Sequence, residues 1–293
     1  MAISATQVKE LRERTGAGMM ECKRALESVD GDLDAAAEHL RKEGLAKADK
    51  KASRVAAEGA IFLAQDDQAA VMVEVNCETD FVAKEQDFGN FGREIASLTL
   101  DQRPADVEAL GALPMAAGTV EERRRSLIAT IGENIGIRRF VRIEAEGGVV
   151  AAYLHGSRIG SLVAVDIDDA ELARDLAMHV AASAPAYLDA DAVPTSVTDA
   201  EREIIAAQSD SAGKPPEIVA KMVEGRLRKF LAEITLVGQP FVKDPDTTVG
   251  KLLQQKSAKI TGFARFEVGE GIEKEVDDFV GEVMAQAREA QRA

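Results

Sequence analysis

Residues 71–85 have the sequence V-M-V-E-V-N-C-E-T-D-F-V-A-K-E, a strand pattern followed directly by a polar corner. The first five residues alternate with the two-residue period of a β-strand, so three valines share one face and Met72 and Glu74 share the other. Thr79 is a good N-cap, and Asp80 would lie in the first turn of a short helix, where a carboxylate complements exposed N–H groups. The stretch therefore predicts a strand that turns into a short helix.

Phe81 follows two polar residues at this predicted strand-to-helix corner. Two interpretations are open. In the first, Phe81 fills the local core, as most phenylalanines do. In the second, the corner presents the aromatic ring outward for a contact with another molecule.

An internal repeat surrounds this stretch. Each copy opens with a hairpin, continues into a helix and closes with a strand in which Phe140 matches Phe263 and Arg142 matches Arg265. The corresponding segments are E-G-A-I (58–61) and E-G-G-V (146–149), second hairpin arms 71–75 and 162–165, helices 91–98 and 172–179, and closing strands 137–144 and 260–267. The repeat predicts two similar α+β subdomains, each a small antiparallel sheet with helices.

The two copies differ in length at the corner. Copy one takes 18 residues from Val75 to Arg93, whereas copy two takes 9 from Val165 to Arg174. A segment that determines the fold should occur in both copies. The extra residues of copy one therefore favour a functional role for C-E-T-D-F-V-A-K-E and an outward Phe81.

The first 44 residues predict a three-helix module. Ser4 begins a capping box with Gln7, Met19 starts a second helix, and Asp32 caps a third helix that we expect to end at Gly44. The charged, Ala-rich segment 45–54 then favours a solvated linker over a phosphate-binding site.

Copy two contains a long insertion between its helix and its closing strand. Segments 198–208 and 216–236 have helical patterns separated by Gly213 and Pro215-Pro216, which predicts a projecting helical hairpin suited to an antiparallel contact or a dimer seam. The polar tail 273–293 carries an apolar stripe that packs either on its own domain or on a partner (Val276, Phe279, Val280, Val283).

Composition narrows the class of protein. The chain has 293 residues, 46% of them apolar and 30% charged, as in a soluble globular protein. Its net charge of −15 and the lack of Trp argue against nucleic acid as the main partner. Residues 1–54 hold 11 Lys/Arg and 10 Asp/Glu, leaving 25 and 41 in the remainder, so the larger part is the acidic one. Two cysteines without a C-x-x-C pattern, no signal-peptide core and no spanning apolar run predict a cytoplasmic, non-membrane location.

Enzyme signatures are missing from the sequence. The three histidines, His39, His155 and His179, lie far apart without ligand-spaced neighbours, so we expect no metal site. Nucleotide-binding glycine loops and Ser or Cys catalytic signatures do not occur, and we expect no cofactor. His155, in H-G-S-R-I-G, is expected at the tip of the second hairpin, as solvated surface or as a contact residue. An enzyme with clustered groups of perturbed pKa remains the competing class.

Several long motifs resemble the bacterial translation elongation factor Ts family, and together they cover essentially the whole chain. They are T-G-A-G-M-M-E-C-K-R-A-L (15–26), V-N-C-E-T-D-F-V-A (75–83), I-G-E-N-I-G-I-R-R (131–139), H-G-S-R-I-G (155–160), A-M-H-V-A-A (177–182), G-Q-P-F-V (238–242) and T-G-F-A-R-F-E-V-G-E-G-I-E (261–273). The match departs most in surface stretches such as 101–120.

The resemblance implies a fold and a domain order. It implies an α+β chain with an N-terminal module like ubiquitin-associated three-helix domains (1–54), core subdomain one (55–144) and core subdomain two (145–293). The second subdomain would carry the helical hairpin (about 190–237) and a C-terminal helix (about 273–293) that touches the partner. The hairpin would be a dimerisation or coiled-coil module, which leaves a homodimer or a 2:2 complex open.

The resemblance also implies a function and its residues. The family promotes release of GDP from the GTPase elongation factor Tu, without a catalytic constellation of its own, and stays bound until GTP enters. The motif that disturbs the partner's magnesium and phosphate site matches Thr79, Asp80, Phe81 and Val82. The partner-binding positions match Met19, Met20, Lys23, Ile131, Gly132, His155 and Ile234.

Overall fold

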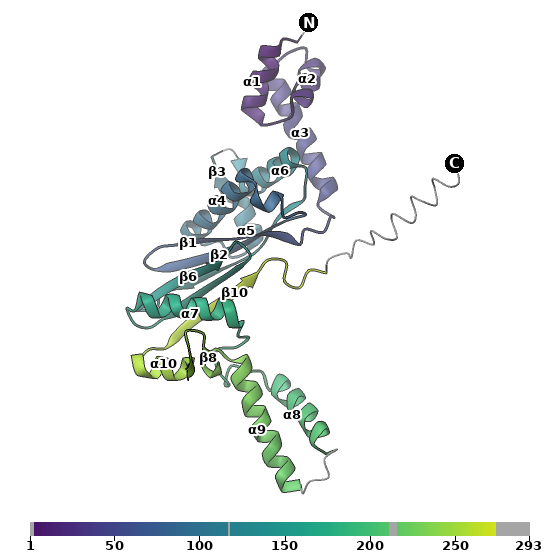
Figure 1. Cartoon of the computed structure of the whole chain (residues 1–293). Helices are drawn as coiled ribbons and strands as arrows, with labels where there is room; N and C mark the ends of the chain where they lie inside the picture. Colours follow the sequence, from purple (N-terminus) through teal and green to yellow (C-terminus); the bar gives the residue numbers. More distant parts are fainter. Residues whose placement is uncertain (1–2, 117, 211–215, 274–293) are drawn as a thin grey trace, which may run out of the picture.

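The computed structural model describes residues 3–116, 118–210 and 216–273. The N-terminal helices lie at one end of an elongated molecule, two sheets occupy the middle, and a helical hairpin projects at the opposite end (Figure 1). The tail 274–293, for which we predict an amphipathic helix, lies outside the described residues.

Three helices form the N-terminal module: α1 (Ala5–Thr15), α2 (Met19–Ser28) and α3 (Leu33–Lys51). The capping box of Ser4 with Gln7 is present, and the Asp32 carboxylate accepts hydrogen bonds from the first turn of α3. Leu11, Cys22 and Leu26 are fully buried between the helices. The predicted starts of all three helices are thereby confirmed.

The predicted end of the third helix at Gly44 is wrong, because α3 continues to Lys51. Gly44 faces helix α6 (Val120–Ile131), where a Cβ would lie 3.1 Å from the Ala129 side chain. The glycine therefore permits close helix packing instead of ending the helix. Ala48, in the segment predicted as a solvated linker, is buried in the same core as α6. This segment is helical, and one face of it is packed and not solvated.

Sheet one contains β1 (Glu58–Gln65), β2 (Ala69–Cys77) and β5 (Ile135–Glu144), with β2 in the centre. Sheet two contains β6 (Val149–His155), β7 (Ile159–Val165) and β10 (Ile260–Glu267), with β7 in the centre. Both sheets are antiparallel. The chain is thus a mixed α+β protein built around small antiparallel sheets.

The register of the two sheets matches the alignment of the sequence repeat. Phe140 lies opposite Val73 in sheet one, and Phe263 lies opposite Val163 in sheet two. Arg142 and Arg265 likewise lie two positions further along their strands, opposite the residues that the repeat aligns with each other. The matched residues therefore occupy equivalent positions in the two sheets.

The two sheets and two helices stack in layers, with α4 (Gln86–Gln102) outside sheet one and α7 (Ala170–Ser183) outside sheet two (Figure 1). Val71, Val73 and Val75 pack toward α4, whereas Met72 faces the second sheet and packs with Leu162. Both faces of β2 are consequently covered, and every residue of this strand is buried.

Glu74 is the charged residue of this buried strand, and its carboxylate joins the two sheets. It accepts hydrogen bonds from Arg138 (3.0 Å) and Arg139 (2.6 Å) of β5, from Asn76 (3.1 Å), and from the Gly269 N–H (2.8 Å) that follows β10. A bulge in the β2–β5 pairing falls at Arg138, which lets two consecutive arginines reach one carboxylate. Burial by itself would raise the pKa of Glu74, but these hydrogen bonds hold the pKa below its ordinary value.

Helices α8 (Thr195–Asp210) and α9 (Pro216–Ile234) form the projecting hairpin, close to the predicted bounds. Ile205 is buried between the two helices against Val223 and Leu227. Ile204 and Ile218 remain 51% and 48% exposed. The hairpin thus has its own small core and a further apolar surface.

The smaller elements fill the connections between these layers. They are η1 (Val82–Lys84), α5 (Val107–Ala112), β3 (Pro114–Met115), β4 (Gly118–Thr119), η2 (Leu236–Gly238), β8 (Pro240–Phe241), β9 (Asp244–Thr248) and α10 (Val249–Lys256). Across the described ranges, no helix has the length and apolar character needed to cross a membrane.

Replacing Glu74 with Gln should lower the free energy of unfolding by about 3 kcal/mol at neutral pH, because two arginines lose a buried partner. Since folding lowers the pKa of Glu74, its stabilisation is present above the unfolded pKa near 4.5 and is lost as pH falls through the lower folded value. Urea unfolding of both proteins from pH 7 to pH 3 measures this. The difference should shrink toward acid, and a difference that is constant with pH would contradict the assignment.

Candidate functional site

The corner between β2 and α4 holds Phe81 in solvent. Its side chain is 77% exposed, whereas the next residue, Val82, is 7% exposed and packs into the core beside α4. Val82 begins η1, a 3-10 helix of one turn, so a short helix follows the strand as predicted, but it starts after Asp80 and does not include it. The prediction that Phe81 points outward is therefore confirmed, and the interpretation of Phe81 as a core residue is wrong.

The N-cap position of η1 is Phe81 and not Thr79 as predicted, but the side chain of Thr79 still contacts the first residue of this turn. Its hydroxyl accepts from the Val82 N–H (3.4 Å) and donates to the Glu133 carboxylate (2.7 Å). The Thr79 N–H donates to the other oxygen of Glu133 (3.0 Å). One carboxylate thus holds both polar groups of Thr79.

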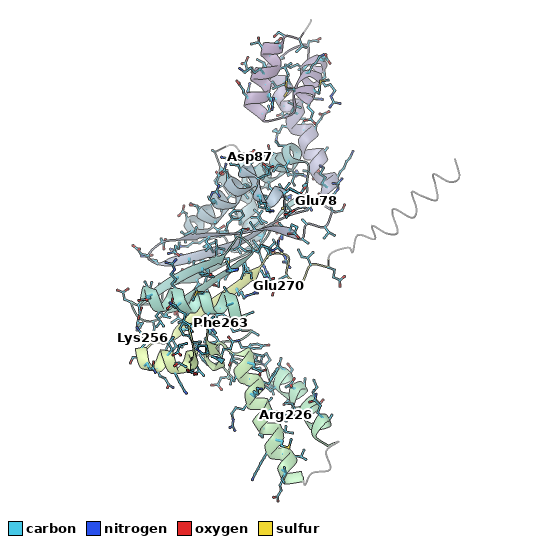
Figure 2. All side chains as sticks on the ribbon, in the orientation of Figure 1. Glu78, Asp87, Arg226, Lys256, Phe263 and Glu270 are labelled. Atoms are coloured by element: carbon cyan, nitrogen blue, oxygen red, sulfur yellow. The ribbon has the colours of Figure 1, made fainter. Side chains whose placement is uncertain are left out.

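Glu78 makes the reciprocal contact. Its carboxylate accepts from the Asn134 N–H (2.6 Å) and pairs with Arg54 (3.4 Å), just past the end of α3. The Asn134 amide group also donates to the Arg54 carbonyl (2.8 Å). In Figure 2, Glu78 lies at this junction between the corner and the end of α3. Segments 78–79 and 133–134 are therefore linked in both directions.

Asp80 is exposed beside Phe81 and pairs with Lys84 (2.6 Å), one turn along. The hydrogen bond from Lys84 holds the pKa of Asp80 below its ordinary value. At neutral pH the corner therefore presents an aromatic ring next to a carboxylate that carries its charge.

Cys77 lies directly before the corner but is no candidate nucleophile. Its thiol is buried and donates to the Thr79 carbonyl (3.1 Å). Burial, together with the charges of Glu133 and Glu58, raises the pKa of Cys77 to about 12. A thiol in this state packs as a small apolar group.

The turn between β6 and β7 lies next to the corner. As predicted, His155 is at the tip of this hairpin, where it pairs with Ile159 and is exposed. The turn is attached to sheet one, because the Ile61 N–H donates to the Ser157 carbonyl (2.8 Å) and Arg158 pairs with Glu58. A cleft of about 460 Å³ separates the turn from η1 and the start of α4. Two distant motifs thus share one surface.

Ile131 and Gly132 complete this surface at the end of α6. Both are half-buried, and Gly132 ends the helix with a φ of 93°, a left-handed conformation suited to glycine. The next two residues, Glu133 and Asn134, make the contacts to the corner described above. The structure therefore brings Thr79 to Glu133, the residue that directly follows Gly132.

The remaining predicted contact residues lie elsewhere. Met19 and Met20 on α2 are 59% and 66% exposed, and Lys23 follows one turn later, at the N-terminal end of the molecule (Figure 1). Ile234 is half-buried at the base of the hairpin, where its carbonyl accepts from the Ala186 N–H (2.9 Å). The predicted contact residues thus form one central group around the corner, a second group on α2 and a third site at Ile234.

Sequence reasoning missed Glu78, Glu133 and Asn134 as individual residues. Their partners lie more than 50 positions away in the chain. Glu133 and Asn134 do occur in the motif I-G-E-N, so the motif marked the place without indicating what it contacts.

The described part of the chain offers no candidate metal site. Within the described residues, no group of three or more His, Cys, Asp or Glu could hold a metal ion. His179 is fully buried, contacts Gln239 (3.0 Å) and accepts from the Val242 N–H (3.2 Å), and its burial lowers its pKa. This histidine stays neutral and connects α7 to the chain after the hairpin.

Comparison with known proteins gives the family. The sequence model described as Elongation factor TS matches residues 78–270. The chain is 58% identical to an elongation factor Ts of Thioalkalivibrio sulfidiphilus, over 99% of this chain and 100% of that protein. It is 59% identical to an elongation factor Ts of Methylococcus capsulatus, over 98% of this chain and 99% of that protein. The matched region includes the exposed corner, the end of α6 and the turn between β6 and β7. The chain belongs to the elongation factor Ts family.

Proposed function

We propose that this chain releases GDP from the GTPase elongation factor Tu by inserting Phe81 beside the partner's magnesium and phosphate site. Membership of the elongation factor Ts family makes the chain a nucleotide exchange factor of translation elongation. Beyond family membership, we infer how the chain releases GDP, which residues contact the GTPase and how the chain self-associates. We expect it to act in the cytoplasm.

One observation carries the mechanism, which is the exposure of Phe81 between two anchored neighbours. A phenylalanine that is 77% exposed leaves a large apolar side chain in water. Thr79 before it and Val82 after it are both held by the protein. This arrangement suits a rigid wedge, because a side chain that is already oriented loses less entropy on binding.

The physical effect of such a wedge follows from the chemistry of Mg²⁺. This ion demands near-ideal octahedral geometry, so shifts of about 1 Å in the loops around it weaken its binding. Loss of the ion exposes the charge of the phosphates, which favours release of GDP. Phe81 would displace the partner's elements, the charged Asp80 would contact them, and buried Val82 and hydrogen-bonded Thr79 would keep the corner in place.

The other contact residues extend the proposed interface. Ile131, Gly132 and His155 flank the corner, while Met19, Met20 and Lys23 on α2 and Ile234 at the hairpin base would contact other parts of the partner. By linkage, the factor by which this chain weakens GDP binding equals the factor by which GDP weakens binding of this chain. The complex without nucleotide therefore lasts only until GTP enters.

Phe81→Ala should slow GDP release from elongation factor Tu at least tenfold while leaving stability within about 0.5 kcal/mol, since the ring is exposed. Stopped-flow release of labelled GDP measures the rate. Phe88→Ala is the matched control, because Phe88 is fully buried and its loss should cost about 3–5 kcal/mol of stability. A wild-type release rate for Phe81→Ala would contradict the proposed role of Phe81 in exchange.

A chain of residues 41–293 should remain folded and bind the GTPase more weakly. This truncation removes α1, α2 and the first part of α3, but it keeps Ala48 in its core and the ion pair of Asp49 with Arg125. The concentration of this chain that gives half-maximal GDP release should rise about tenfold or more, a loss of about 1.4 kcal/mol. Unchanged concentration dependence would contradict the docking role of the N-terminal module.

Self-association through the hairpin is the third part of the proposal, because Ile204 and Ile218 expose apolar surface there. Light scattering at high concentration should give a mass above the 31.3 kDa monomer, and Ile204→Ser with Ile218→Ser should restore the monomer. Ile205→Ser is the neighbouring control, because Ile205 is buried between α8 and α9. This change disturbs the core of the hairpin and not its exposed surface. A wild-type protein that stays monomeric would contradict self-association through the hairpin. GDP release by the double variant should differ little from that by the wild type.

A further inference from the structure

The turn that follows α6 holds the exposed corner through two reciprocal contacts. Glu133 accepts from the N–H (3.0 Å) and the hydroxyl (2.7 Å) of Thr79, and Glu78 accepts from the Asn134 N–H (2.6 Å). Each segment thus contributes a carboxylate to the backbone of the other. Hydrogen bonds to charged groups are roughly twice as strong as neutral ones.

The Thr79 hydroxyl passes this constraint to the turn that bears Phe81. A hydroxyl can donate one hydrogen bond and accept others. Here it donates to Glu133 and accepts from the Val82 N–H (3.4 Å), which is the first N–H of η1. Phe81 therefore lies between a residue fixed by Glu133 and a residue fixed by burial in the core.

We propose that Glu133 is a positioning residue for exchange, which acts by fixing Thr79 and thereby the direction of the Phe81 ring. The inference rests on the proposed function of Phe81 and adds a residue that does not itself need to contact the GTPase. Without the carboxylate, the N–H and hydroxyl of Thr79 lose their shared acceptor. The corner then keeps Val82 in the core and the contact of Glu78 with Asn134, but Thr79 is no longer held by a carboxylate, and Phe81 samples more orientations.

Glu133→Gln tests the proposal, because an amide offers a single acceptor oxygen where the carboxylate offers two. GDP release should slow on the order of tenfold, which corresponds to about 1.4 kcal/mol of activation free energy. Glu108→Gln removes the same charge from an exposed position of α5 and should leave the rate unchanged. A Glu133→Gln protein with the wild-type rate overturns the proposal.

The Phe81→Ala background separates positioning from direct contact. If Glu133 acts through the ring, adding Glu133→Gln to Phe81→Ala should slow release by less than about twofold further. Multiplying effects would mean that Glu133 acts on the partner independently, which overturns the proposal. The isosteric Thr79→Val removes the hydroxyl and should slow release as Glu133→Gln does.

A second readout needs no partner. The chain contains no Trp, so Phe81→Trp introduces a single Trp at the corner, whose emission can be excited separately from that of the two tyrosines. Adding Glu133→Gln should increase the loss of fluorescence anisotropy on the nanosecond timescale, while adding Glu108→Gln should not. Unchanged anisotropy overturns the positioning role. If Phe81→Ala alone releases GDP normally, the proposed function fails, and the anisotropy still decides whether Glu133 orders the corner.

Discussion

The buried carboxylate of Glu74 is the interaction on which the arrangement of the two sheets depends. β2 is covered by α4 on one face and by the second sheet on the other, so an ionised side chain there needs partners close by. Arg138 and Arg139 provide them from β5, and the Gly269 N–H provides one from the end of β10. One residue therefore fixes the register of β2 against β5 and the position of the second sheet against the first. Glu270, labelled in Figure 2, follows β10, and its carboxylate also pairs with Arg139.

A strand fixed in this way gives the exposed corner a rigid base. β2 runs two residues past Val75 before the connection 78–85 begins, whereas β7 ends at the matched Val165 and is followed by 166–169 only. The longer connection is attached at both ends, and its apolar ring points into water. Exposure of Phe81 is unfavourable for the isolated chain, and the surrounding contacts hold it there. That combination is what a binding surface requires, since a preordered side chain loses less entropy in the complex.

Sequence patterns predicted the local elements because local rules govern them. The capping box at Ser4, the alternation of β2, the repeat of two hairpins with their closing strands and the two helices of the projecting hairpin all depend on residues a few positions apart. The same rules failed at Gly44, where a glycine that usually ends helices lies in the middle of one. Packing of α3 against Ala129 of α6 outweighs the weak helix preference of glycine, which costs only about 1 kcal/mol.

Local sequence patterns were enough to predict the helices and strands, the repeat with its unequal corner, and the motifs that mark the family. Tertiary structure alone decided that Phe81 points outward, that Glu133 and Asn134 hold the corner, and that the end of α3 packs on α6. The physical reason is the separation of the partners along the chain. Hydrogen bonds between residues 78–79 and 133–134, and burial of Val82 beside α4, arise only when the sheet brings these segments together, so no local pattern contains them.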